Sequence, residues 1–484
     1  MSDFSEAIKT EIKKSKQTLL YLSDISGLSL DHISKMRQGK RLPQDEEKIK
    51  KLISALQCSE KTALSLISMY KIERMGHEQW NCMQEIKKML EYHSTFLEGS
   101  WKNQYGLNKE VRKIKVLQTK TEVMEFIQYV LSCIGDTEEE KIRIITEEIP
   151  EMLVEILTQH LNRCHFTCEH LFSLKKNRDP GGSLCNIRFI NQIMPLIQSE
   201  GKYIPYYDYE DTGEEMLPNW IMGKEWAIGL RGNMGGGIVL WDKEQIEYME
   251  CLFERKRRNK RQLLRCFDDL TQWIEEVNER KGRYLKENEG NTFRSFDAKN
   301  YYLETTPCLW FLIPMELLEK HILLEKEEKN QLMELVRHRI TQLYQENRVL
   351  FFTIEGIERI ADEGRFSGIP ENIYSPLTMP ERKIVLEKYL QWMVKKESQY
   401  FIIDTSQLDL APQTSVYSTV SLADNEVSFC MAVGKNTYCS IREAGVAEKI
   451  NQFCHMMEDG EFVYSREKGI DLIRKIINNC EESV

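Results

Sequence analysis

Four cations near the amino terminus have the types and spacing for contacts with a nucleic acid. They are Lys35, Arg37, Lys40 and Arg41, and the last three lie in a short loop that ends at Pro43. Lysine and arginine side chains that gather in a loop beside a helix suit contacts with phosphate oxygens. The residues therefore predict a surface for a phosphodiester backbone.

Positive charge is concentrated in the same part of the chain. Residues 1–76 contain 14 lysines and arginines against 10 aspartates and glutamates, a net charge of +4, while the whole chain of 484 residues has a net charge of -10. The remaining residues therefore have a net charge of -14. An isolated basic segment of this kind favours a nucleic-acid partner for the first 76 residues.

The elements that must position these cations are two short helices. Leu19, Leu22 and Ile25 recur at helical spacing in the first helix, and Ile33 and Met36 recur in the second. We expect these five side chains to pack the two helices against each other.

A tight turn is expected between the two helices. Gly27 lies where the first helix must end, and its φ is expected to be positive. The side chain of Ser29 is expected to cap the second helix by accepting a hydrogen bond from the amide of Asp31 or His32. The second helix would then be free to enter a DNA major groove.

Residues 27–43 resemble the XRE-type, lambda-repressor-like helix-turn-helix regulators. The resemblance follows the run Gly27-Leu-Ser29, Ile33-Ser-Lys35-Met36 and the basic loop to Pro43, and it covers about residues 5–75. One departure is Leu19, because the family often has glutamine there for a phosphate contact.

The resemblance implies a set of DNA-binding residues. Side chains at the start of the second helix would face base edges, and the loop cations would hold the backbone. The candidate DNA-binding residues are Thr18, Ser29, Leu30, Asp31, His32, Lys35, Arg37, Lys40 and Arg41.

Motifs for catalysis are absent from the sequence. Gly232–Gly237 lacks the lysine of a P-loop and the spaced glycines of a dinucleotide fingerprint, so a hairpin turn between two strands is the better interpretation. His160, Cys164 and Cys168 would share one face if the segment were helical. However, no second ligand pair lies nearby and the segment is expected to run from a helix end into a strand, so packing is favoured over a metal. We predict no cofactor, no metal and no enzyme activity.

Length and composition indicate a multidomain protein of the cytoplasm. The chain is too long for one core, no apolar run approaches the ~20 residues of a membrane helix, and the first residues do not form a signal peptide. Thirteen cysteines are scattered without a Cys-x-x-Cys pair, which favours reduced, buried thiols.

Beyond the basic segment, the pattern predicts two duplicated α/β modules with mixed sheets. Apolar runs of strand length alternate with helical runs, in the same order in two stretches about 190 to 200 residues apart. The first stretch has helices at 149–161, 187–197 and 246–253 and strands at 203–208, 226–230 and 238–241. The second has helices at 332–343, 383–393 and 446–457 and strands at 349–354, 400–404, 427–433 and 438–441.

Five segments are predicted in total. They are an all-α helix-turn-helix DNA-binding domain at 1–76, a connecting helix at 77–110, an α/β module at 111–270, a connecting segment at 271–300 and a second α/β module at 301–484. The duplicated region is also weakly similar to the phospholipase-D-like sensor halves of some transcription regulators. Catalytic members carry His-x-Lys in each half, and neither half here contains it.

The sequence favours a sequence-specific regulator of transcription that binds double-stranded DNA as a homodimer, with a C-terminal region that senses an effector or assembles subunits. Two alternatives remain open at this point. One is a nucleic-acid-processing or defence enzyme fused to a DNA-binding head, and the other is a protein-interaction module without DNA binding. The sequence names neither the operator nor the effector.

Overall fold

The computed structural model describes most of the chain, in two compact units. The described residues are 2–91, 114–134, 140–164, 166–176, 179, 181–209, 219–267, 299–307, 312–345, 348–365, 373–395, 399–410, 415–420, 427–433, 437–441 and 443–482. The units comprise residues 1–84 and 85–484. Residues 92–110 of the expected connecting helix and 271–298 of the expected connecting segment lie outside the described residues.

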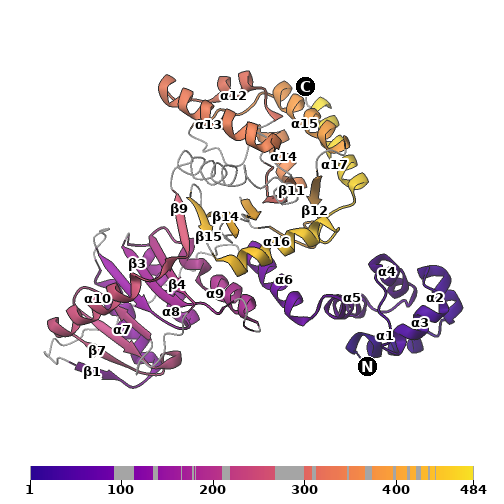
Figure 1. Ribbon diagram of the computed structural model, residues 1–484. Helices are drawn as coiled ribbons and strands as arrows, with labels where there is room; N and C mark the ends of the chain where they lie inside the picture. Colours follow the sequence, from indigo (N-terminus) through magenta and orange to yellow (C-terminus); the bar gives the residue numbers. More distant parts are fainter. Residues whose placement is uncertain are drawn as a thin grey trace, which may run out of the picture. The chain divides into compact units, whose positions relative to one another are not determined.

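The first unit is a bundle of helices (Figure 1). In order they are α1 (Asp3–Ser15), α2 (Leu19–Ser26), α3 (Leu30–Arg37), α4 (Glu46–Ala55) and α5 (Glu60–Met75), and α6 (His77–Leu90) begins in this unit. Helix α1 packs against α3 and α5, while α2 packs against α3 and α4. Most helices begin at a serine, threonine or aspartate that caps the first turn, which defines their start points.

The core of this bundle contains four of the five side chains expected to join α2 and α3. Leu22, Ile33 and Met36 are fully buried, and Leu19 is half-buried against them. The prediction for Ile25 was wrong, because this side chain is 48% exposed. It lies on the outer face of α2, where helical spacing alone does not say which apolar residues meet the core.

The second unit contains two mixed sheets. The first sheet has the strand order β1-β7-β6-β5-β2-β3-β4-β8, in which β2, β3 and β4 run parallel. Its strands are β1 (Ile114–Leu117), β2 (Lys141–Ile145), β3 (Thr167–Ser173), β4 (Lys202–Asp208), β5 (Asn219–Met222), β6 (Ala227–Leu230), β7 (Gly237–Leu240) and β8 (Arg261–Gln262).

Helices cover both faces of this sheet. They are α7 (Lys120–Ser132), α8 (Glu151–Leu161), α9 (Gly182–Ile197) and α10 (Lys243–Arg257). Met249 and Phe253 of α10 pack against Leu171 on one face. On the other face Phe189 of α9 lies beside His170, with ring centroids 6.2 Å apart. Neighbouring residues of β3 thus point to opposite layers, as strand geometry requires.

The second sheet has the strand order β12-β11-β10-β13-β14-β15-β9, in which β10, β11 and β12 run parallel. Its strands are β9 (Leu264–Phe267), β10 (Asn300–Glu304), β11 (Arg348–Thr353), β12 (Gln399–Ile403), β13 (Ser415–Val420), β14 (Val427–Val433) and β15 (Thr437–Ile441). Strand β9 belongs to this sheet although it lies within residues 111–270 of the sequence.

Helices also cover both faces of the second sheet. They are α12 (Met315–His321), α13 (Lys326–Gln345), α14 (Ile354–Glu363), α15 (Met379–Val394), α16 (Ala444–Glu458) and α17 (Arg466–Glu482). The core on one face joins Phe352 and Ile402 to Tyr389 of α15 and Ile473 of α17. Helix α16 packs against β10, β13 and β14. The protein is therefore multidomain, with a helical part and α/β parts.

The helices and strands expected in both stretches of the α/β region are present. Their observed bounds differ from the expected ones by a few residues, as for α9, which begins at Gly182 instead of 187. The glycine-rich segment 232–237 joins the antiparallel strands β6 and β7 through a short 3-10 turn, which confirms the predicted hairpin. No helix in the described residues is long and apolar enough to cross a bilayer.

Helix α6 is held to both α/β parts of the second unit. The side chain of Glu85 accepts a hydrogen bond from Asn191 of α9 at 3.1 Å. Lys87 donates to the carbonyl of Gln407 at 2.5 Å, and Glu91 accepts from the amide of Asp409 at 3.1 Å, both in the loop after β12. Its apolar residues Ile86, Met89 and Leu90 are buried. This part of α6 is thus a packing helix, not an exposed one.

Candidate nucleic-acid interface

The turn between α2 and α3 has the geometry that the sequence predicts. Gly27 ends α2 with a φ of +67°, and its amide donates to the carbonyl of Ser23 at 2.9 Å. The side chain of Ser29 accepts a hydrogen bond from the amide of His32 at 3.2 Å, which confirms the predicted cap. Ser23 donates to the carbonyl of Leu28 at 2.6 Å and fixes the turn further. The start of α3 is therefore well defined.

The outer face of α3 is accessible. Leu30 is 45% exposed, and the side chains of Asp31 and Lys35 are 66% and 47% exposed. Since Ile33 and Met36 are fully buried on the opposite side, the helix separates a core face from a polar face. A helix of eight residues with one free face has the size and shape to enter a major groove.

Asp31 and Lys35 form an ion pair one turn apart on this face. The carboxylate of Asp31 and the ammonium of Lys35 are 2.8 Å apart. The hydrogen bond from Lys35, helped by the charge of Arg41, lowers the pKa of Asp31 below its usual range. The aspartate is therefore ionised at neutral pH.

His32 lies in a positive environment. Partial burial lowers the pKa of its imidazole, and the charges of Arg41, Lys48 and Lys35 lower it further, while Asp31 opposes them. The neutral form is therefore favoured at neutral pH. The same charges identify Lys48 of α4, which the sequence did not point to. Lys48 is 21 residues after Gly27 in the chain, and only the fold brings its side chain near the turn.

The basic loop after α3 is held close to the helix end. The amide of Lys40 donates to the carbonyl of Lys35 at 2.9 Å, and Gly39 adopts a φ of +69° to allow this turn. The hydroxyl of Tyr70 donates to the carbonyl of Pro43 at 2.8 Å and anchors the far end of the loop to α5. Lys40 and Arg41 are exposed.

The candidate residues divide into three structural groups. The hydroxyls of Thr18 and Ser29 cap α2 and α3, so they support the helix starts. Lys35, Lys40 and Arg41 are exposed cations at the end of α3 and in its loop, and Arg37 is half-buried there. Leu30, Asp31 and His32 occupy the first turn of α3.

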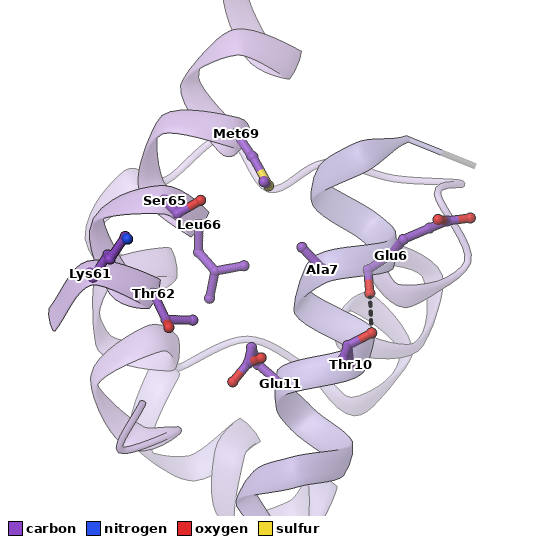
Figure 2. Close-up of a pocket in the computed structure, with 9 residues that line it drawn as sticks. All are labelled: Glu6, Ala7, Thr10, Glu11, Lys61, Thr62, Ser65, Leu66 and Met69. Atoms are coloured by element: carbon purple, nitrogen blue, oxygen red, sulfur yellow. Dashed lines mark hydrogen bonds between the residues drawn. The ribbon is translucent and has the colours of Figure 1, made fainter. Parts of the chain in front are cut away.

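A shallow groove lies elsewhere in the bundle, between α1 and α5 (Figure 2). Figure 2 shows Ala7 on one side and Leu66 and Met69 on the other, with Glu11 and Lys61 among the charged residues that line it. None of the candidate DNA-binding residues lines this groove. The candidate interface therefore lies outside this groove.

A second basic run, at Arg255–Arg261, is partly neutralised by neighbouring acidic residues. Arg257 at the end of α10 contacts Glu254 at 2.7 Å, and Lys260 contacts Asp208 at 2.5 Å. The side chain of Lys260 is only 6% exposed. These two cations therefore have partners within the fold.

The cysteine and histidine segment at 160–170 is divided between two elements. His160 lies on α8, and Cys168 and His170 lie on β3. Nε2 of His170 is 2.7 Å from the hydroxyl of Thr146, and Nδ1 is 2.7 Å from the hydroxyl of Tyr203. Both ring nitrogens thus have partners, and within the described residues no group of three potential metal ligands comes together.

His321, Ser375 and Glu381 are the residue types of a catalytic triad, but they do not have its geometry. Nε2 of His321 lies 3.0 Å from a carboxylate oxygen of Glu381, and Nδ1 lies 3.0 Å from both the carbonyl and the hydroxyl of Ser375. Because Nδ1 faces a carbonyl oxygen, it serves as a donor there and is not placed to accept the serine proton. The cluster joins the segment at 375 to α12 and α15.

Comparisons with known proteins leave the family open. No protein-family model matches the chain, and no curated protein matches it. Among solved structures, it is similar to a polyphosphate kinase from Porphyromonas gingivalis, with 11% identity, a TM-score of 0.22 and coverage of 76% of this chain and 56% of that one. It is also similar to TrmBL2, an archaeal chromatin protein, with 9% identity, a TM-score of 0.20 and coverage of 54% and 94%. Likenesses this weak carry no argument about function.

Proposed function

We propose that this protein is a sequence-specific, DNA-binding regulator of transcription. The observation that carries the proposal is the face formed by α3 and its loop, where Lys35, Lys40 and Arg41 are exposed around a capped helix whose apolar side is buried. The helix enters the major groove, and the loop cations contact phosphates on its rim. The XRE-type resemblance belongs to this proposal and rests on residues 5–75.

The regulator acts as a homodimer. Helix-turn-helix proteins read two half-sites about one DNA turn apart, so two heads must be held at a defined separation. The part of the chain that the structure describes has one such head, formed around α2 and α3. We assign the contact between the two chains to the second unit, residues 85–484.

The two α/β parts of the second unit are duplicated modules. Each has three parallel strands, β2-β3-β4 or β10-β11-β12, flanked on one side by an antiparallel set, β5-β6-β7 or β13-β14-β15. In each module an early strand, β1 or β9, pairs antiparallel with the last of these. A shared order of this length supports duplication more strongly than the alternation of helices and strands does.

The second unit serves as the sensor or assembly region. Helix α6 supports this role, because Glu85 contacts the first module and Lys87 and Glu91 contact the second. An effector that changes how the modules are arranged would alter the anchorage of the helix that leads to the head. Operator binding would then change without any catalytic step.

The DNA-binding proposal is tested by electrophoretic mobility shift. We expect the full chain to shift fragments from around its own gene, and the double variant Lys40→Glu with Arg41→Glu to lose the shift. A charge-matched control is Lys14→Glu with Lys61→Glu, since Lys61 lines the groove between α1 and α5 and Lys14 pairs with Glu11 beside it. The control should retain most of the affinity. A wild-type chain that binds no fragment at low salt would refute the proposal.

A further inference from the structure

The ion pair between Asp31 and Lys35 places an acceptor and a donor side by side on the outer face of α3. Their charged atoms are 2.8 Å apart, and both side chains are largely exposed. The pair lies between Leu30 at the start of the helix and the basic loop at its end. It therefore occupies the part of the helix that faces base edges in the proposed complex.

Asp31 is an unfavourable residue for general attraction to DNA. The Lys35 hydrogen bond and the Arg41 charge keep its pKa low, so it remains a carboxylate. A carboxylate beside phosphates weakens binding unless a base donates a hydrogen bond to it. In the major groove, the base edges that donate are the amino groups of cytosine and adenine.

Lys35 restricts this choice further. An ammonium has three N–H donors and no acceptor, so the bond to Asp31 leaves donors for a base. Guanine presents O6 and N7 as two adjacent acceptors, and a lysine or arginine there is the commonest specific contact. In a C·G pair the cytosine amino group lies next to guanine O6, which matches the order of carboxylate and ammonium on α3.

We propose that Asp31 and Lys35 together read one C·G base pair of the operator. The carboxylate of Asp31 accepts a hydrogen bond from cytosine N4, and the ammonium of Lys35 donates to guanine O6 and N7. This inference rests on the proposed DNA-binding function and assigns part of its sequence specificity to the pair. In an A·T pair the adenine offers Lys35 only one acceptor, N7, where guanine offers two. An A·T pair is therefore expected to bind more weakly.

The test compares wild type with Asp31→Ala on a set of operator fragments, each with one base pair replaced. We expect one C·G position in each half-site at which replacement weakens wild-type binding by roughly 5- to 150-fold. For Asp31→Ala, the loss of affinity on replacing C·G at that position should be about fivefold or more smaller than for wild type, because only Lys35 still contacts the pair. Asp31→Asn keeps the size of the side chain but replaces the carboxylate by an amide that suits adenine N6 and N7, so it should also weaken the preference for C·G over A·T.

Asp24→Ala is the matched control, because Asp24 is an exposed aspartate on α2 and its removal changes the charge of the head equally. Both alanine variants should gain similar affinity for unrelated DNA, but Asp24→Ala should keep the base preference of wild type. If wild type prefers an operator and Asp31→Ala has the same preference at every position, or if the lost preference is for A·T, the assignment is wrong while the proposed function stands. If wild type binds no DNA, both fail.

Discussion

His170 illustrates how single polar residues are used inside this protein. Its ring is fully buried between β3 and α9, and each nitrogen has a hydroxyl partner. In the sequence, His170 follows two residues after Cys168, one of the three residues considered above as metal ligands. The fold gives it a structural role, because Thr146 and Tyr203 come from neighbouring strand ends.

Burial lowers the pKa of His170 to about 3. In the unfolded chain the pKa is about 6.5, so below that pH the unfolded state binds a proton that the folded state does not. The free energy of unfolding should therefore fall as pH falls from 6.5 toward 3, by about 1.4 kcal/mol for each pH unit. Urea titrations between pH 7 and pH 5 measure this slope.

The controls for His170 are two glutamine variants. His170→Gln should lose this part of the pH dependence, although it is less stable overall. His455→Gln, at an exposed histidine on α16, should keep it. Equal slopes for wild type and His170→Gln would contradict the assignment.

At the scale of elements, the pair α2 and α3 depends on its turn. The Gly27 backbone is left-handed, and a Cβ added there would meet only the Lys48 side chain, at 3.9 Å. The cost of a substitution is therefore conformational and not steric. The turn fixes the angle between α2 and α3, so it supports the interface without touching a partner.

Gly27→Ala should lower the unfolding free energy of the helical bundle by about 1 kcal/mol, because alanine disfavours this backbone conformation. Amide hydrogen exchange at buried α3 positions such as Ile33 reports the local opening free energy in the full chain. Gly27→Asn should cost less, since asparagine tolerates the left-handed region better. An alanine variant with unchanged protection would show that the turn does not limit stability.

At the scale of the whole molecule, α6 links the second unit's two modules. The side chain of Asn191 donates to both the carbonyl and the carboxylate of Glu85, at 2.9 and 3.1 Å. Arg188 contacts the same carboxylate at 3.3 Å, but its side chain is 54% exposed. The two contacts share one partner and differ in their exposure to water, which allows a direct comparison.

Asn191→Ala should lower the unfolding free energy of the second unit by roughly 1–3 kcal/mol, because it leaves a largely buried carboxylate with fewer donors. Arg188→Ala should change it by less than about 1 kcal/mol, as expected for an exposed ion pair. Chemical denaturation of both variants provides the measurement. A larger effect for Arg188→Ala would mean that the exposed pair, and not the asparagine, anchors α6.

Much of the secondary structure could be predicted because it depends on neighbours along the chain. The apolar spacing of α13, α15 and α16 and the runs of β11 and β14 identify these elements, and Gly27 and Ser29 locate the turn in the head. Strands β2 and β10 were not predicted. They are short and contain charged residues, which are uncommon in a buried strand. In the folded chain Arg143 pairs with Glu169, and Glu304 is buried.

The sequence alone determined the helix-turn-helix pattern, the basic loop and the order of the α/β elements, because caps, glycine conformation and hydrophobic periodicity act over a few residues. Tertiary structure alone decided which strands pair, as when β9 joins the second sheet, and it brought Lys48 into the field of His32 and Asn191 to Glu85. Such contacts join residues far apart in the chain. Their partners are selected by the packing of whole elements, which no local spacing records.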